Sequence, residues 1–453
     1  MGPLAALAVF QAAAPASAAE AWSLHHALSA PPALKLSGSF RVRHEGVHGQ
    51  YRPGANPTDD LVSLRTIVGA EYGTGPVRIG GEFYDSRAYG GKIGGAIGAN
   101  EVDAAELVQA YLIADIKAPF GKGSAASVQA GRFTLNLGSR RLVAADDYRN
   151  VTSGYTGVKL DARTAGGTTA TVIYTLPQVH FPDDLPSILR NRVALDKESF
   201  DLVLWGANVA RPGLIGKTAG DIAFYGLDEH DAPGRPTRDR SLRTASARLI
   251  RNPAPRRFDY EIEASYQWGS ILADLRPAAP ALNVSATFLH LDAGYQFAGG
   301  WKPRVSVEYD RASGDDAKAS YGRFDTLYGM RRADFAPSGI YAALGRTNIS
   351  SPGMRVEVVP SARLDGFVSY RGLWSASATD GFSTTGIRDP SGRSGAYAGQ
   401  HLEGRLRYWL VPGRLRFEFN GAILFKAGVL KRAPNAPKTG DTQFISTAVT
   451  VNF

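Results

Sequence analysis

The sequence of 453 residues contains no cysteine, only three methionines and no long apolar run. The absence of cysteine excludes a disulfide scaffold, a thiolate zinc site, an iron–sulfur cluster and a cysteine nucleophile. No internal segment approaches the 18 or so apolar residues that a membrane-spanning helix needs, which excludes a helical membrane protein. The chain is nevertheless 44% hydrophobic, so it is not disordered.

The first segment of the chain resembles a signal peptide. Residues 2–19 are uncharged and rich in alanine, and they include Ala16-Ser17-Ala18, a small-x-small cleavage pattern. We expect a signal peptide over residues 1–19, followed by a periplasmic N-terminal segment over residues 20–33. The basic region that usually opens such a peptide is missing, and the alternative is an alanine-rich disordered terminus. Export would also explain why the chain avoids cysteine.

From residue 34 onward the apolar residues recur with a period of two. In 34–43, 258–268, 304–309, 402–410 and 414–419, apolar or aromatic residues alternate with charged or polar ones. This period predicts β-strands with one apolar and one charged face. In a soluble sandwich the apolar face would meet a second sheet, whereas in a membrane barrel it faces lipid and the charged face lines water.

The lengths of the connections decide between these folds. Tight turns at 73–75, 166–167, 299–300 and 412–413 alternate with long loops such as 312–352. This alternation predicts one all-β domain over 34–453, a transmembrane antiparallel up-and-down β-barrel of about 18 strands. Its turns would be periplasmic and its long loops extracellular. The chain ends in an alternating strand with a terminal Phe453, which is typical of outer-membrane barrels.

One motif competes with this interpretation. His44-Glu45-Gly46-Val47-His48 matches H-E-x-x-H, the helical zinc signature of metalloproteases. The run continues an alternating strand, and on a strand the two histidines would lie about 13 Å apart at ~3.3 Å per residue. That separation is too large for one metal ion. We expect no enzyme activity, no catalytic residue and no cofactor.

The charged face of the predicted strands is rich in basic side chains, with acidic residues among them. Rows of arginine in a narrow lumen attract anions, and guanidinium binds carboxylate in a bidentate manner. The alternative is a polar lumen in which acids neutralise the bases. The basic residues are spread over many strands rather than clustered, so we expect no nucleic-acid partner. The pore-lining candidates from this pattern are Arg41, Arg43, Arg65, Arg132, Lys159, Arg304, Arg363, Arg371, Arg405 and Arg407.

Paired aspartates occur in the predicted outer loops. The pair Asp315-Asp316 is the candidate for a divalent cation site, because paired carboxylates bind Ca²⁺ or bridge it to lipopolysaccharide. A solvated acidic loop is the simpler explanation of the same residues.

The chain resembles the alginate export family of outer-membrane β-barrels. The resemblance is carried by Glu106–Ile113 (ELVQAYLI), Gln129–Leu142 (QAGRFTLNLGSRRL), Tyr321–Gly329 (YGRFDTLYG) and Leu344–Val359 (LGRTNISSPGMRVEVV). It implies an 18-stranded barrel whose arginine-rich constriction passes alginate. By this similarity Arg132 is the best constriction candidate, with Arg65 and Lys159 as companions and with Arg140 and Arg141 lining the pore from a loop. The 312–352 loop would fold over or into the external mouth.

These observations lead to one main functional hypothesis and several alternatives. The main hypothesis is a passive, anion-selective channel for alginate-like polyuronates in the outer membrane of a Gram-negative bacterium. A general or oligosaccharide-specific anion-selective porin, an outer-membrane enzyme and a purely structural barrel are the alternatives. The expected partners are an anionic polysaccharide or oligosaccharide, outer-membrane lipid and lipopolysaccharide, and the barrel assembly machinery. We expect a monomer.

Overall fold

The computed structural model describes residues 23–276, 278–316 and 320–453. The predicted signal peptide, residues 1–19, lies outside the described residues. The short helix α1 (Leu24–Ala27) lies in the segment expected to precede the barrel. No helix in the described part of the chain is long and apolar enough to cross a membrane.

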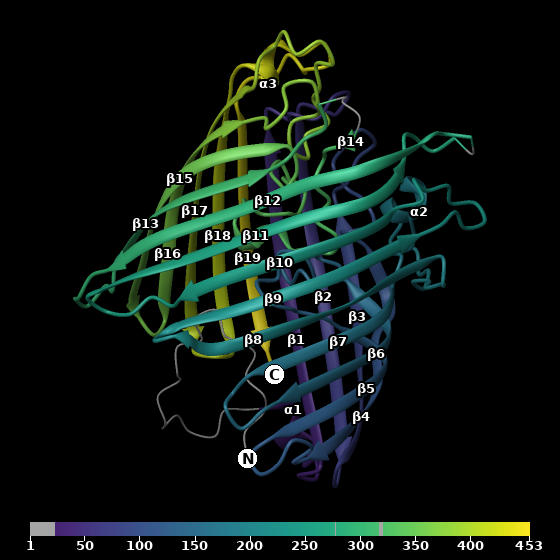
Figure 1. Cartoon of the computed structure of the whole chain (residues 1–453), viewed down its shortest axis with the longest axis vertical. Helices are drawn as coiled ribbons and strands as arrows, with labels where there is room; N and C mark the ends of the chain where they lie inside the picture. Colours follow the sequence, from purple (N-terminus) through teal and green to yellow (C-terminus); the bar gives the residue numbers. More distant parts are fainter. Residues whose placement is uncertain (1–22, 277, 317–319) are drawn as a thin grey trace.

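Eighteen antiparallel strands form a closed β-barrel, as the sequence predicts (Figure 1). Closure joins the first strand to the last, since Phe40 lies opposite both Thr66 in the second strand and Val451 in the last strand. The barrel strands are β1 (Leu34–His48), β2 (Thr58–Gly73), β3 (Val77–Tyr89), β4 (Asp103–Lys117), β5 (Ala125–Thr134), β6 (Gly154–Arg163), β7 (Thr169–Pro177), β8 (Leu202–Ile215), β9 (Thr218–Glu229), β10 (Ser241–Arg251), β11 (Arg257–Leu272), β12 (Ala281–Gln296), β13 (Arg304–Ala312), β15 (Ile349–Ser361), β16 (Leu364–Trp374), β17 (Tyr397–Val411), β18 (Leu415–Lys426) and β19 (Thr442–Asn452).

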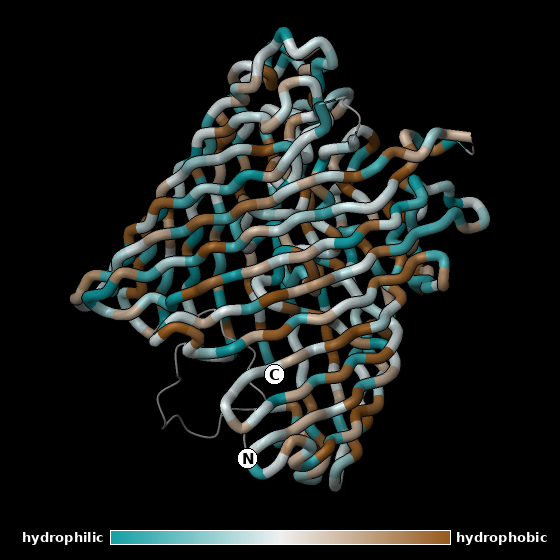
Figure 2. Tube along the Cα trace, in the orientation of Figure 1, coloured by the Kyte–Doolittle hydropathy of each residue, from teal (hydrophilic) through white to brown (hydrophobic). Residues whose placement is uncertain are grey.

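Hydrophobic and hydrophilic residues alternate along the strands (Figure 2). Because successive side chains of a strand point to opposite faces, this alternation gives the barrel an apolar outer face and a polar inner face. In β6, Val158 and Leu160 are 48% and 39% exposed. Between them lies Lys159, which forms an ion pair of 3.0 Å with Asp161. Exposed aliphatic side chains on one face and ion pairs on the other are the pattern of a membrane barrel, in which lipid replaces the second sheet of a sandwich.

The two ends of the barrel differ in the length of their connections. One end carries short turns such as 164–168 and 412–414, and the other carries long loops such as 178–201 and 313–348. The last residue lies at the short-turn end, where Phe453 N–H donates to Gly38 O and Gly38 N–H donates to Phe453 O. Gly38 is required there, because a Cβ would lie 2.2 Å from the Phe453 ring.

Two long loops fold into the barrel. The first inner loop comprises residues 135–153. The second inner loop, residues 313–348, includes the two-residue strand β14 (Ser320–Tyr321), which pairs in parallel with β12, and the 3₁₀ turn η1 (Arg331–Ala333). Two further short helices, α2 (Leu185–Leu189) and α3 (Val429–Arg432), lie in other loops at the same end.

The second inner loop is held by an apolar core inside the long-loop end. Phe324 stacks on Phe288 of β12 with ring centroids 5.6 Å apart, and Tyr341 stacks on Phe444 of β19 at 5.1 Å. All four rings are buried. The expectation that this loop enters the mouth is therefore confirmed.

The two inner loops also bind each other. Tyr328 N–H donates to Leu142 O, and Ala144 N–H donates to Tyr328 O, both at 3.0 Å. These hydrogen bonds join the two loops to each other inside the long-loop end of the barrel.

Candidate channel constriction

At the tip of the second inner loop, residues 331–334, neighbouring side chains have different surroundings. Arg331 lines a cavity that faces the long-loop end. Arg332 reaches the opposite wall, where it forms an ion pair with Glu403 at 3.2 Å. Asp334 is buried among arginines on a third side. The surroundings of this tip are the candidate functional site.

An arginine belt runs along the wall beside this tip. It begins with Arg41 and Arg65, which lie opposite each other on β1 and β2. Both donate to backbone carbonyls of the first inner loop: Arg41 Nη2 lies 2.8 Å from Arg149 O, and Arg65 Nη1 lies 3.0 Å from the same oxygen. The residues of the belt are Arg41, Arg43, Arg65, Arg332, Arg355 and Arg405.

Two aromatic rings connect the other members of the belt. Tyr148, in the first inner loop, lies under Arg43 with 4.7 Å between guanidinium carbon and ring centroid, and under Arg332 at 5.7 Å. Phe367 of β16 lies under Arg332 at 5.4 Å, and its ring is also contacted by Arg355 at 3.7 Å and Arg405 at 5.0 Å. Guanidinium groups stack on aromatic faces in this way, so the rings hold cations together that would otherwise repel.

The belt carries more positive than negative charge. Four of its six arginines form ion pairs, with Glu45, Glu403, Glu357 and Asp365. Glu357 and Asp365 are shared with further arginines outside the belt. Within the described part of the chain, Arg41 and Arg65 contact neutral acceptors and form no ion pair. Among the described residues the belt therefore holds more arginines than ion-paired carboxylates.

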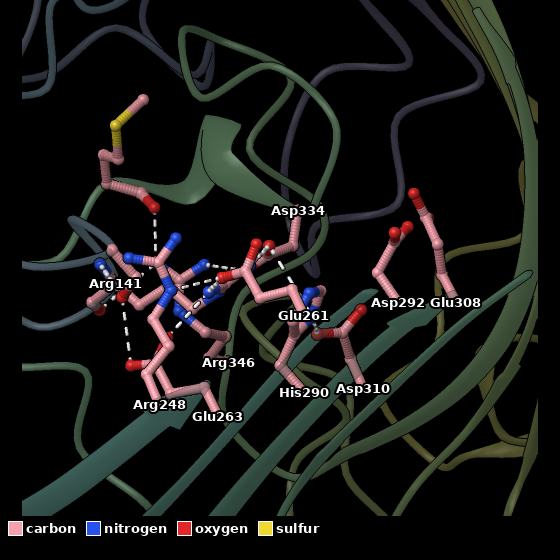
Figure 3. Close-up of polar contacts among 12 residues, drawn as sticks. Arg141, Arg248, Glu261, Glu263, His290, Asp292, Glu308, Asp310, Asp334 and Arg346 are labelled. Carbon is pink, nitrogen blue, oxygen red and sulfur yellow. Dashed lines mark hydrogen bonds and ion pairs between the residues drawn. The ribbon is translucent and has the colours of Figure 1, made fainter. Parts of the chain in front are cut away.

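A second group, the Arg141 network, lies on the other side of the tip (Figure 3). Arg141 Nη2 lies 2.7 Å from Asp334, and its Nη1 lies 2.7 Å from Glu263 of β11. Arg346 Nη1 lies 2.8 Å from Asp334. The network comprises Arg141, Arg346 and Arg371 together with Glu261, Glu263, Glu308, Asp310 and Asp334.

The Arg141 network is closed by Arg371 of β16. Its Nη1 lies 2.8 Å from Asp310, it also pairs with Glu308, and its Nη2 donates to the backbone oxygen of Asp334. Arg371 is 3% exposed. Because every arginine here is met by carboxylate, this group fixes the second inner loop to the wall rather than attracting anions.

A cavity of 540 Å³ opens above the tip, on its long-loop side. Its charged lining is mostly arginine, with only two carboxylates, Glu229 and Asp325. Both of those are paired with Arg240, at 2.8 Å each. Volumes of roughly 300–1,000 Å³ are usual for small-molecule sites. The lining arginines are Arg235, Arg238, Arg240, Arg323, Arg331 and Arg346.

Arg132 does not lie where the sequence predicts. It pairs with Glu106 at 2.7 Å and with Glu198 at 2.8 Å, and the 178–201 loop covers it. Arg132 lies opposite Thr156 in the pairing of β5 with β6, so these two side chains share one face of the sheet. The exposed Val158 lies on that same face, whereas Lys159 lies on the opposite face. The expectation of a constriction arginine at this position is corrected: Arg132 is a neutralised residue at the point where β5 leaves the wall.

The remaining predicted residues lie in the belt, in the Arg141 network or at separate positions. Arg41, Arg43, Arg65 and Arg405 meet in the belt, and Arg407 lies beside them on Asp365 at 2.9 Å. Arg141 and Arg371 meet in the Arg141 network, whereas Arg304 lies nearer the short turns with Asp259 and Asp292. Arg363 lies in the exposed turn between β15 and β16, which corrects its assignment to the pore wall. Lys159 pairs with Asp161 in β6, and Arg140 pairs with Asp147 at 2.9 Å.

In the part of the chain that the structure describes, Asp315 and Asp316 belong to no group of three metal-ligating side chains. Asp315 Oδ1 accepts a hydrogen bond from Gly322 N–H, and Asp316 is exposed. Among the described residues, groups of three metal-ligating side chains lie elsewhere, at Asp103–His180–Asp196 and at His290–Asp310–Asp334. The H-E-x-x-H run lies on strand β1, as predicted, with Glu45 fully buried beneath Gly339.

Sequence reasoning missed the arginines of the second inner loop. Arg331, Arg332 and Arg346 lie in a connection without strand periodicity, so alternation could not assign them to a face. The sequence does contain a signal there, the doublet Arg331-Arg332, which is similar to the pair Arg140-Arg141 that was selected through the family resemblance.

A family model described as alginate export matches residues 33–439. The chain belongs to the alginate export family. As a β-barrel of this family it is an outer-membrane channel protein. A search of curated protein sequences found no match.

Solved porin structures share the fold of this family member at low sequence identity. OccAB1 of Acinetobacter baumannii has a TM-score of 0.60 at 14% identity, covering 93% of this chain and 96% of that one. OccK2 (OpdF) of Pseudomonas aeruginosa, solved in complex with glucuronate, has a TM-score of 0.56 at 11% identity, with coverage of 93% and 96%. A BenF-like porin from Pseudomonas fluorescens Pf-5 has a TM-score of 0.57 at 11% identity, with coverage of 93% and 99%.

Proposed function

We propose that this protein is a passive, anion-selective channel for saccharides that bear carboxylates, with alginate-like polyuronates as its substrate. The observation that carries the proposal is the arginine excess of the belt beside the constriction. Among the described residues Arg41 and Arg65 have no carboxylate partner, so no ion pair cancels their positive charge, which would attract a passing anion. Membership of the alginate export family supports the same substrate class. We place the channel in the outer membrane of a Gram-negative bacterium, with its long loops outside.

The geometry suggests a route in two stages. The arginine-lined cavity of 540 Å³ would receive a carboxylate at the long-loop end. The doublet Arg331-Arg332 then connects this cavity to the belt, because Arg331 lines the cavity and Arg332 stacks within the belt. Several weak sites in series favour conduction, since an ion that binds too tightly at one site does not leave.

A general or oligosaccharide-specific anion porin is the second candidate. It is favoured by the two inner loops, which narrow the lumen, and by the size of the cavity, which matches a small molecule better than a polymer. OccK2 (OpdF), which shares this fold, was solved in complex with glucuronate, a single uronate. The two candidates differ in whether a chain of linked uronates binds better than one uronate.

Single-channel recording in a planar bilayer under a salt gradient tests the proposal. We expect a reversal potential that indicates anion selectivity, and block by oligomannuronate at lower concentration than by glucuronate. Equal block by monomer and oligomer would favour the general porin. Conductance without anion preference, or no conductance, would contradict the proposal.

A further inference from the structure

A buried acidic cluster lies outside the lumenal arginine groups, where the 178–201 loop meets the top of β4. The two legs of this loop pair at Val179 and Lys197. This pairing brings His180 and Asp196 together, with 2.7 Å between His180 Nδ1 and Asp196 Oδ2. The other oxygen of Asp196 accepts from Phe181 N–H at 2.9 Å.

Asp103, the first residue of β4, completes a triad with these two side chains. One ligand atom from each residue lies within 4.8 Å of the others. Asp103 is 2% exposed and Asp196 is 4% exposed. Asp103 Oδ1 has no hydrogen-bond partner. A buried carboxylate oxygen without a partner is costly, so its position beside two further ligand groups points to a cation.

The charge around the triad supports this inference. Glu106 and Glu198 lie next to it, and the one guanidinium that contacts them is Arg132. Arg132 reaches only the backbone oxygen of Asp196 and forms no ion pair with Asp103 or with the Asp196 carboxylate within the described residues. Four carboxylates therefore surround one arginine, and a divalent cation would restore the balance.

The second triad also consists of one histidine and two aspartates, but arginines balance its carboxylate charge. In His290–Asp310–Asp334, Arg371 lies 2.8 Å from Asp310. Arg346 lies 2.8 Å from Asp334 (Figure 3). Arginine already occupies the position of a cation at both carboxylates. That triad has no need of a metal ion, whereas Asp103 has no such partner.

We propose that Asp103, His180 and Asp196 bind one divalent transition-metal ion, which fastens the 178–201 loop to the wall. An imidazole with two carboxylates is a donor set suited to Zn²⁺, Co²⁺ or Mn²⁺, whereas Ca²⁺ and Mg²⁺ prefer oxygen ligands alone. Two backbone N–H groups orient the site from outside. Phe181 N–H holds Asp196, and Asp196 N–H donates to Glu106 at 2.7 Å. Water would complete the coordination.

The direct test is metal titration of the full chain, purified in detergent and treated with a chelator. Zn²⁺ binding is measured by calorimetry, and Co²⁺ binding by its visible absorption, which reports nitrogen and oxygen ligation. We expect one equivalent of either ion. H180A and D103N should each lower the affinity at least tenfold, whereas D183N, which alters an exposed carboxylate of the same loop, should leave it unchanged. Binding that survives both ligand variants, or no saturable binding, would overturn the proposal.

Thermal unfolding gives a second readout, which separates a metal ligand from a structural residue. D103N removes a buried charge without a partner, so we expect a higher Tm than wild type in the absence of metal. The same variant should lose the rise in Tm that Zn²⁺ produces in the wild-type protein. A D103N protein that is less stable without metal and still responds to Zn²⁺ would contradict the assignment.

Discussion

The arginines on the two sides of the second inner loop serve different purposes. In the Arg141 network three arginines meet five carboxylates, and Asp334 of the loop lies at the centre. In the arginine belt four of the six arginines stack on two aromatic rings, and the same four form ion pairs with carboxylates. Arginine anchors the loop where carboxylates surround it. Where neutral acceptors and aromatic rings surround it, arginine leaves a net positive charge.

This difference shows why counting arginines on a barrel wall does not locate a selectivity filter. A guanidinium that is matched by carboxylate contributes little field at a distance, whereas one bound to carbonyl oxygens keeps its net charge. Arg371 and Arg41 are both buried arginines of the inner face. Only Arg41 lacks a carboxylate partner in the described part of the chain, so the two are expected to respond differently to substitution.

Removing the centre of the Arg141 network should have the largest effect. In D334A, Arg141 and Arg346 would be buried without this counter-charge, and breaking a buried pair costs about 3–5 kcal/mol. We expect the second inner loop to detach, with a lower Tm in detergent and a larger single-channel conductance. D274N, in an exposed loop, serves as the control. A D334A protein with wild-type Tm and conductance would refute the anchoring role.

Neutralising the unpaired part of the belt should change selectivity instead of stability. R41Q/R65Q retains donors for the carbonyls of the first inner loop but removes two charges. We expect weaker anion preference in the reversal potential, with stability within about 1 kcal/mol of wild type. R363Q, in the exposed turn, is the matched control. Unchanged selectivity in the double variant would remove these two residues from the filter.

The barrel could be predicted from the sequence because a strand pattern is local. The alternating run 34–43 lies within β1, and the tight turn predicted at 412–413 lies in the observed turn 412–414. The period of two also identified Arg41, Arg43 and Arg65, whose faces follow directly from alternation. A closed barrel of 18 strands then follows from pairing each strand with its neighbour.

The constriction could not be predicted in the same way, because it depends on contacts between distant loops. Arg141 meets Asp334 across 193 positions of sequence, and no local pattern predicts that pairing. The prediction for Arg132 is corrected for a related reason. Glu198, which neutralises Arg132, lies in a loop whose position cannot be inferred from strand alternation. The long loops therefore determine which wall arginines remain unpaired.

A variant at Arg132 tests this conclusion directly. R132Q should leave anion selectivity unchanged, because Glu106 and Glu198 already neutralise the guanidinium outside the lumenal belt. The reversal potential is measured beside that of R41Q/R65Q in the same lipid and salt. A shift as large as that of the double variant would restore Arg132 as a filter residue.

The smallest expected effect concerns Glu101, in the loop before β4. Burial, and after it the nearby Glu45, raise the pKa of this carboxyl to about 7, whereas Gly98 N–H, Arg149 and Arg43 oppose the shift. The folded protein then holds a proton that the unfolded chain releases near pH 4.5, so stability should fall as pH rises from about 4.5 to 7 and level off above that. E101Q should remove this part of the pH dependence of Tm. A variant whose pH profile matches wild type over this range would show that Glu101 is ionised in the folded state throughout, with its charge balanced by Arg43 and Arg149 on the belt side of the loop.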